Sequence, residues 1–186
     1  MGIRAAKQED AAALAALCIE VWLHTYCRPG IPPVFASYAL ETFTPANMAA
    51  LISDPDQHLM VDGVDYAGQE GLRGYLRWCC PSKRPLQACP PAEIDTLYVR
   101  ERHKGQGIGS ALLKASYADM HKAGHDAAYL AVNAENKEAV AYYLGKGFET
   151  LGESWFEIED GCYLNFVMQK AFGTMRLPEI SDERSE

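Results

Sequence analysis

A glycine-rich turn between a strand and a helix constrains the fold of this chain more than any other feature. Residues 92–99 follow a loop that holds four prolines, and they are expected to form a strand. After the turn at 104–110, apolar side chains from Ile108 to Ala115 return at helical spacing. Residues 127–132 form the next expected strand, parallel to the first because a helix connects the two. The sequence therefore predicts an α/β fold with a parallel pair of strands.

The remaining elements follow from apolar periodicity, prolines and glycines. Residues 2–6 are expected to form a short strand, and an amphipathic helix follows with apolar positions from Leu14 to Trp22. Prolines between 29 and 33 end this helix, and a second helix is expected up to about Ser53. The other expected elements are antiparallel strands at 59–61 and 72–79 joined by a turn-prone stretch, a helix at 135–144, and a closing hairpin at 148–156 and 162–168.

The length of 186 residues fits a single domain with a sizeable core. We expect one domain over residues 1–172 and a polar, flexible tail over 173–186. No apolar run approaches the ~20 residues that a membrane-spanning helix needs. The N-terminal residues lack the basic and apolar parts of a secretory signal. The sequence thus predicts a cytoplasmic protein without membrane partners.

Charge and cysteine usage limit the classes of partner. Seventeen basic and 25 acidic side chains give a formal charge of −8, which disfavours nucleic-acid binding because such binding neutralises phosphates. The same balance weakly favours a cationic substrate. The six cysteines lack the paired spacing of a zinc site, so free thiols and no metal site are expected. His103, His121 and His125 are expected at the surface without a functional role.

The turn from Lys104 to Ser110 suits a phosphate group. Glycines let a ligand approach the backbone, and the free N–H groups of the first helical turn carry about half a positive charge. The alternative is that Gly105 and Gly107 only permit a tight turn. A dinucleotide-binding fingerprint is excluded because Ser110 stands where its third glycine is required. A nucleotide P-loop is excluded because Ser110 and Ala111 stand where Lys and Ser or Thr are required.

Two blocks of the sequence resemble the GNAT superfamily of N-acetyltransferases. The first runs from Lys104 to Gly109 with the pattern K-x-x-G-x-G, after the strand that ends at Val99. Lys104 replaces the usual Arg or Gln, which keeps a positive charge and loses planar bidentate bonding. The second block runs from Asn136 to Phe148 with the pattern N-x-x-A-x-x-Y-Y-x-x-x-G-F. Both the patterns and their separation are similar to those of the family.

The resemblance implies a central mixed β-sheet flanked by helices, with a V-shaped splay between the two central parallel strands that receives acetyl-coenzyme A. Amide groups of the cofactor would pair with the strand edge exposed by the splay. Asn136 is implied as a further cofactor contact, although asparagine also suits a helix N-cap. The implied strand contacts are Leu97, Tyr98 and Val99. The implied pyrophosphate site comprises Gln106, Gly107, Ile108, Gly109 and Ser110, and Lys104 and Gly105 are implied as further cofactor-binding residues.

Acetyl transfer to an alkyl amine needs a neutral nucleophile, and deprotonation of the amine at neutral pH costs roughly 4 kcal/mol. The resemblance implies Glu93 as the base that relays this proton through water. Asp95 shares the strand parity of Glu93 and is an alternative, and either carboxylate can instead be a solvated strand end. The resemblance implies Tyr143 as the acid that protonates the leaving thiolate, against a purely packing role. Tyr142 is expected to point elsewhere, because adjacent helix positions are ~100° apart.

The sequence therefore predicts an acetyl-coenzyme A-dependent N-acetyltransferase that transfers acetyl to a primary amine by direct attack in a ternary complex. A weak resemblance of residues 22–32 to polyamine and other small-amine acetyltransferases favours a small cationic amine as substrate. Acetylation of a protein N-terminus or lysine is an alternative. A non-catalytic acyl-coenzyme A sensor or interaction module is another. The oligomeric state is left open, a homodimer included.

Overall fold

The structure is a computed structural model that describes residues 2–27, 29–158 and 161–173. The expected flexible tail lies outside the described residues except for Gly173. The strands are β1 (Ile3–Ala5), β2 (Gln57–Tyr66), β3 (Gln69–Cys79), β4 (Ala92–Val99), β5 (Ala127–Asn133), β6 (Glu149–Ile158) and β7 (Gly161–Ala171). The helices are α1 (Ala11–Tyr26), α2 (Pro33–Thr42), α3 (Pro45–Ser53), α4 (Ile108–Lys122) and α5 (Lys137–Gly145), with single 3₁₀ turns at Gln8–Asp10 and Glu101–His103.

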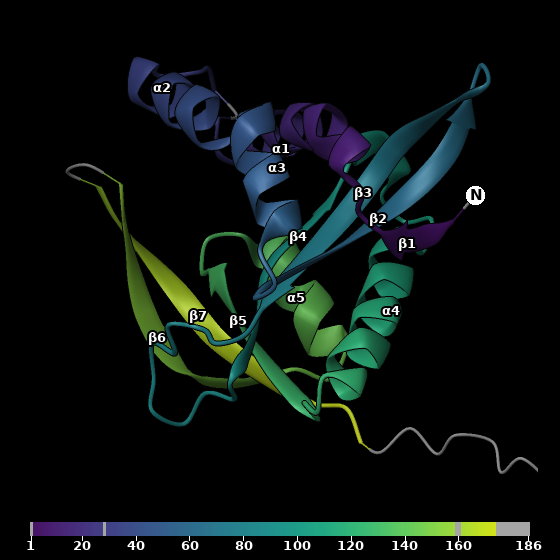
Figure 1. The fold of residues 1–186 in the computed structure, drawn as a ribbon. Coiled ribbons are helices and arrows are strands. Elements are labelled where there is room, and N and C mark those ends of the chain that lie inside the picture. Colours follow the sequence, from purple (N-terminus) through teal and green to yellow (C-terminus); the bar gives the residue numbers. More distant parts are fainter. Residues whose placement is uncertain (1, 28, 159–160, 174–186) are drawn as a thin grey trace, which may run out of the picture.

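One mixed sheet of seven strands organises the described residues, in the order β1-β2-β3-β4-β5-β7-β6 (Figure 1). β4 and β5 pair in parallel, and every other neighbouring pair is antiparallel. The expected mixed α/β fold with a parallel central pair is therefore confirmed. None of the described helices is long and apolar enough to cross a membrane.

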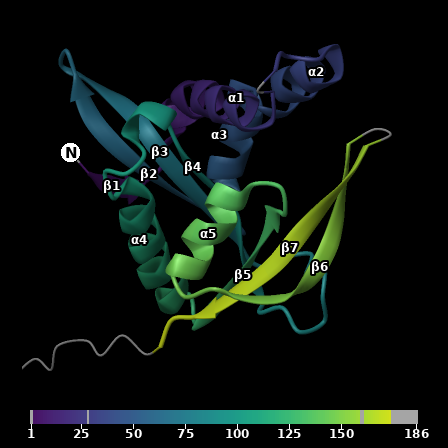
Figure 2. The same ribbon diagram turned by 180° about the vertical axis from the view of Figure 1, so that it is seen from behind.

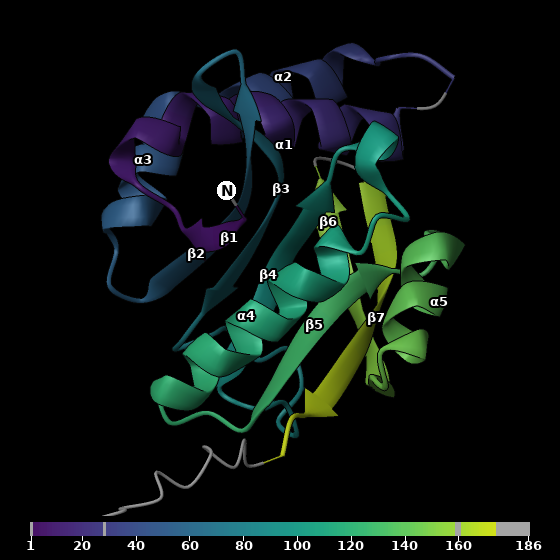
Figure 3. The same ribbon diagram turned by 90° about the vertical axis from the view of Figure 1, so that its right-hand side faces the viewer.

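The central pair of strands separates after a short stretch of pairing. β4 and β5 are in register only at Ala92 opposite Ala128 and at Glu93 opposite Tyr129. Beyond Glu93 the two strands part, while β5 continues to pair along its whole length with β7 (Figure 3). The expected V-shaped splay is thus confirmed. It leaves one edge of β4 without a strand partner in the described chain, and such an edge can pair with an extended ligand.

Helices cover both faces of the sheet, as Figure 1 and Figure 2 show. α4 packs against β2, β3 and β4, where Leu76 and Leu112 are fully buried, and α5 joins the same cluster through Tyr143. On the opposite face α1 and α3 pack against β2 and β3 around Leu14 and Val61. The sheet is therefore packed between two apolar layers, one on each face.

Two expectations about local structure are wrong. The expected single helix up to Ser53 is divided into α2 and α3, because Pro45 cannot continue a helix and instead starts a new one. Thr44 caps this new start by accepting a hydrogen bond of 3.1 Å from the Asn47 backbone N–H. Most of the stretch that was expected to be a turn between the two antiparallel strands belongs to β2 and β3 themselves. It turns only at Ala67 and Gly68, both of which have positive φ, as a two-residue hairpin turn requires.

Candidate active site

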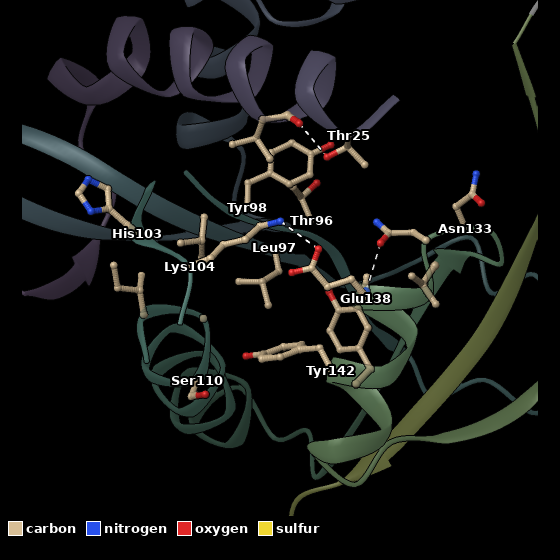
Figure 4. A pocket seen from close by; sticks show the side chains of 18 of the residues that line it. Thr25, Thr96, Leu97, Tyr98, His103, Lys104, Ser110, Asn133, Glu138 and Tyr142 are labelled. Carbon is tan, nitrogen blue, oxygen red and sulfur yellow. Dashed lines mark hydrogen bonds and ion pairs between the residues drawn. The ribbon is translucent and has the colours of Figure 1, made fainter. Parts of the chain in front are cut away.

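A cavity of about 460 Å³ occupies the splay between β4 and β5, with α4, α5 and the end of α1 around it (Figure 4). It brings together most of the residues that the sequence singled out. Glu93 and Gln106 are the exceptions, because neither is among its lining residues. The lining residues expected from the sequence are Leu97, Tyr98, Val99, Lys104, Gly105, Gly107, Ile108, Gly109, Ser110, Asn136 and Tyr143.

The glycine-rich turn brings the start of α4 to the wall of this cavity. Gly105 and Gly107 have φ values of 74° and 81°, a left-handed conformation that glycine adopts without strain. Gly107 is the N-cap of α4, and within the described chain no side chain caps this end of the helix. The first N–H groups of α4 therefore lack the usual side-chain acceptor, which leaves them free for an anion. The assignment of pyrophosphate to this turn stays a prediction.

Lys104 lies at the mouth of the cavity between two acidic side chains. Its Nζ is 2.8 Å from a carboxylate oxygen of Glu101 and 3.4 Å from one of Glu138, which lies on α5 (Figure 4). Burial alone would lower the pKa of Lys104, but the two carboxylates raise it above its ordinary value. A permanent positive charge thus stands beside the turn. Gln106 instead donates from its side chain to the backbone carbonyl of Arg102 at 3.2 Å.

Asn136 performs the structural role that the sequence left as an alternative. Its Oδ1 accepts a hydrogen bond of 3.1 Å from the Ala139 backbone N–H and so caps α5. The residue also lines the cavity. Because the cap uses only the amide oxygen, the amide nitrogen is still available as a donor to a ligand.

Two adjacent tyrosines of α5 line the cavity together. Tyr143 is only 9% exposed, and burial raises its pKa, so its phenol stays protonated at neutral pH. The expectation that Tyr142 points away from the site is wrong. Its ring contacts that of Tyr143 at 5.4 Å between centroids and extends toward Ser110 (Figure 4). A rotation of ~100° leaves both side chains on the same concave wall.

Gly109 leaves room for the hydroxyl of Tyr142. A Cβ atom at this glycine would lie 2.9 Å from the Tyr142 hydroxyl oxygen, closer than real Cβ contacts allow. That hydroxyl is buried beside the side chain of Ser110, which opposes the rise that burial causes in the pKa of Tyr142. Tyr142 therefore brings a phenolic hydroxyl to the start of α4, a feature that was not predicted from the sequence.

Glu93 lies at the vertex of the splay rather than in the cavity wall. Its carboxylate accepts a hydrogen bond of 2.8 Å from the Tyr129 hydroxyl of β5. Burial raises the pKa of Glu93, and the hydrogen bond from Tyr129 opposes this rise. A raised pKa brings a carboxylate nearer to the range in which it takes up and releases protons at neutral pH.

Asp95 lines the cavity, but its carboxylate is already engaged. The register of β3 and β4 pairs Arg77 with Thr96 and Trp78 with Ile94, so a β-bulge leaves Asp95 without an opposite residue. The Asp95 carboxylate accepts hydrogen bonds from Arg77 and from the Thr96 hydroxyl. The strand parity that Glu93 and Asp95 share therefore does not give them equivalent positions.

The sequence analysis missed most of the other end of the cavity. There Thr25 and Tyr26, at the end of α1, meet Asp95 and Thr96 of β4. The only sequence signal for this end was the weak pattern at residues 22–32. His103 was expected to have no role, yet it also lines the cavity, because the 3₁₀ turn after β4 carries it to the mouth.

Comparison with known proteins agrees with this architecture. Residues 33–148 match the model of the acetyltransferase (GNAT) family. The chain is 21% identical over 168 residues to an uncharacterised N-acetyltransferase in the pepI 3′ region of Lactobacillus delbrueckii subsp. lactis, covering 88% of this chain and 93% of that protein.

Solved structures share the fold at low sequence identity. The PaiA N-acetyltransferase of Thermoplasma acidophilum, solved in complex with coenzyme A, superposes with a TM-score of 0.69 at 23% identity, covering 92% of this chain and all of that one. An acetyltransferase of the GNAT family from Streptococcus pneumoniae gives a TM-score of 0.66 at 21% identity, covering 92% and 98% of the two chains. The family match spans more than half of the sequence and includes both β4 and the glycine-rich turn. This chain belongs to the acetyltransferase (GNAT) family.

Proposed function

We propose that this protein is an acetyl-coenzyme A-dependent N-acetyltransferase whose acceptor is a primary amine. The observation that carries the proposal is a single cavity that joins the uncapped start of α4 to the free edge of β4 and to the buried phenol of Tyr143. Phosphate groups suit the helix start, amide groups suit the strand edge, and a reacting thioester would then lie near the phenol. The coenzyme A complex of the Thermoplasma acidophilum protein supports this choice of cosubstrate.

The chain's residues divide the proton transfers between them. Acetyl-coenzyme A supplies the acetyl group as an activated thioester, and the amine of the acceptor attacks its carbonyl carbon directly. Glu93 accepts the proton of the ammonium group through water, because its raised pKa makes it a better base than an ordinary glutamate. Tyr143 donates its phenolic proton to the leaving sulfur, and the second proton, which the attacking nitrogen loses as the amide forms, restores the phenol. The protein thereby limits the positive charge on the attacking nitrogen and the negative charge on the leaving sulfur, which a poorly solvated cleft would stabilise badly.

The acceptor enters from the end of the cavity at α1 and has a small cationic amine group. Tyr26 and Tyr98 present aromatic surface there, and Asp95 and Thr96 present oxygen atoms. Aromatic faces attract ammonium groups, and hydroxyl oxygens accept hydrogen bonds from them, whereas the charge of Asp95 is already offset by Arg77. The formal charge of −8 adds a weak long-range attraction. A polyamine or another small amine satisfies these conditions.

A screen of acceptors tests the proposed function. Incubation of the protein with acetyl-coenzyme A and a polyamine should release free thiol at least about tenfold faster than incubation without amine, as a thiol reagent measures. Parallel reactions with a simple monoamine, an aminoglycoside, and peptides with a free N-terminus or lysine identify the class of acceptor. A protein that binds acetyl-coenzyme A but releases no thiol with any of them is a sensor, and the proposal fails.

Replacement of Glu93 by glutamine is expected to lower kcat/KM at neutral pH by about 100-fold, because the amine then loses its base. Glutamine keeps the size of the side chain, and its amide oxygen can still accept the Tyr129 hydrogen bond. The loss should shrink at high pH, where the amine is neutral without assistance. The matched variant is Asp95→Asn, which should retain the acid limb of the pH profile. If Glu93→Gln kept the wild-type pH profile of kcat/KM and Asp95→Asn lost its acid limb, the base would be Asp95 and not Glu93.

A further inference from the structure

The vertex of the splay contains a tyrosine that the proposed mechanism does not use. Tyr129 of β5 is 0% exposed and stands directly opposite Glu93 at the last paired position before β4 and β5 separate. Its hydroxyl donates a hydrogen bond of 2.8 Å to Oε2 of Glu93. The Tyr129 phenol of β5 is thus hydrogen-bonded to the Glu93 carboxylate of β4 at the point where the two strands begin to separate.

A second contact fixes the direction of this hydroxyl. The backbone N–H of Arg84, in the loop between β3 and β4, donates to the Tyr129 oxygen at 3.1 Å. The same arginine is anchored by its side chain, which donates to the backbone carbonyl of Cys89 at 2.8 Å. Because an ionised carboxylate can only accept, the proton of the Tyr129 hydroxyl is the one that lies between Tyr129 and Glu93. The ring is held by packing against Cys89 and Val167, both fully buried.

The charged neighbours of Glu93 come from each element packed around it. Burial raises the pKa of Glu93 most, and the Tyr129 hydrogen bond is the largest opposing effect. Asp95 on the same strand raises this pKa further, whereas Arg77 of β3 and Lys83 of the loop lower it. Cys79 of β3 stays a neutral thiol, because burial raises its pKa to about 12. Tyr129 therefore counts most among the groups that favour the ionised carboxylate.

We infer that Tyr129 is a positioning residue that orients the carboxylate of Glu93 and keeps it available as the base for the acceptor amine. The inference rests on the proposed function, since it presumes that Glu93 takes the amine's proton. The phenol touches neither acceptor nor cosubstrate. It acts only through the hydrogen bond to Glu93, from a fully buried position at the vertex of the splay.

Replacement of Tyr129 by phenylalanine tests this role through the pH profile of kcat/KM. Without the hydrogen bond, the carboxylate of Glu93 holds its proton more tightly, so the acid limb moves to higher pH. At a fixed pH on that limb kcat/KM should fall by about tenfold, whereas the value on the plateau should fall less than about threefold. Tyr117→Phe is the control. It also removes a buried hydroxyl, one that has no partner among the described residues, and it should leave the profile unchanged.

Two further variants separate the possible outcomes. In a Glu93→Gln background, Tyr129→Phe should no longer alter the profile, because the two residues act as one unit. A ring-fluorinated tyrosine at position 129 is a stronger donor and should move the acid limb to lower pH, which provides a test even where the phenylalanine variant folds poorly. An equal loss of activity at every pH would reduce Tyr129 to a structural role and overturn the inference. Failure of the wild-type protein to transfer acetyl to any amine would instead overturn the proposed function.

Discussion

Replacement of Tyr143 by phenylalanine is expected to lower kcat by about 100-fold or more while the affinity for acetyl-coenzyme A changes little. The substitution keeps the ring, which is only 9% exposed and packs against Phe148 at 5.4 Å between centroids. It removes only the hydroxyl, whose pKa burial raises, so that the phenol is a proton donor at neutral pH. Single-turnover acetyl transfer is the measurement, because it separates the chemical step from slow product release.

A packing role for Tyr143 predicts the opposite pattern. Tyr143→Phe would then turn over normally, and Tyr143→Ala would lose about 3 to 5 kcal/mol of stability by opening a cavity in the core. Tyr117→Phe, on α4, is the matched control for loss of a buried hydroxyl and should keep the wild-type rate. An unchanged single-turnover rate in folded Tyr143→Phe protein would leave water as the proton donor.

Replacement of Gly107 by valine is expected to abolish the thermal stabilisation that acetyl-coenzyme A gives to the wild-type protein. At a hundredfold excess over Kd the ligand should add about 2.7 kcal/mol, or about 5 to 10 °C in melting temperature. Gly107 has a φ of 81°, and a Cβ there would meet no atom of the described chain within 4 Å. The substitution therefore acts by forcing the turn out of its left-handed conformation and by placing bulk beside the free N–H groups of α4.

Gly124→Val is the control for backbone strain. Gly124 has a φ of 87°, and a Cβ there also meets nothing within 4 Å, but it follows the far end of α4 and does not line the cavity. Both variants should lose a similar amount of stability without ligand. Only Gly107→Val should lose the shift with ligand, as differential scanning fluorimetry measures. A full shift in folded Gly107→Val protein would remove this turn from the cofactor site.

The sequence predicted best the segments whose structure depends on local chemistry. β4 begins and ends at Ala92 and Val99, as expected, because a proline-rich loop precedes it and the glycine-rich turn follows. Proline restricts the backbone and glycine frees it, whatever surrounds them. The break at Pro45 was missed although the same rule applied. A turn was expected between β2 and β3, but its restriction to Ala67 and Gly68 was missed because a residue such as Ala67 rarely adopts positive φ.

The site was harder to predict where its parts come from distant segments. The two blocks that resemble the family predicted the cavity walls formed by β4, α4 and α5, because the residues of each wall lie within one short segment of the sequence. The contact between Glu93 and Tyr129 spans 36 positions and depends on strand register, which no local pattern reveals. The bulge at Asp95 is equally invisible in the sequence, and it upsets the simple alternation of side chains along β4.

The splay also determines how the protein holds together as a folding unit. Among the described residues, only two paired positions link the strands β1–β4 to the strands β5–β7, so the backbone ladder nearly divides the sheet into two halves. The apolar cluster shared by α4, α5 and both halves supplies most of the connection between them. A ligand that binds in the cleft and pairs with the free edge of β4 would add contacts between the two halves. Binding in the cleft should therefore make the two halves unfold together more cooperatively.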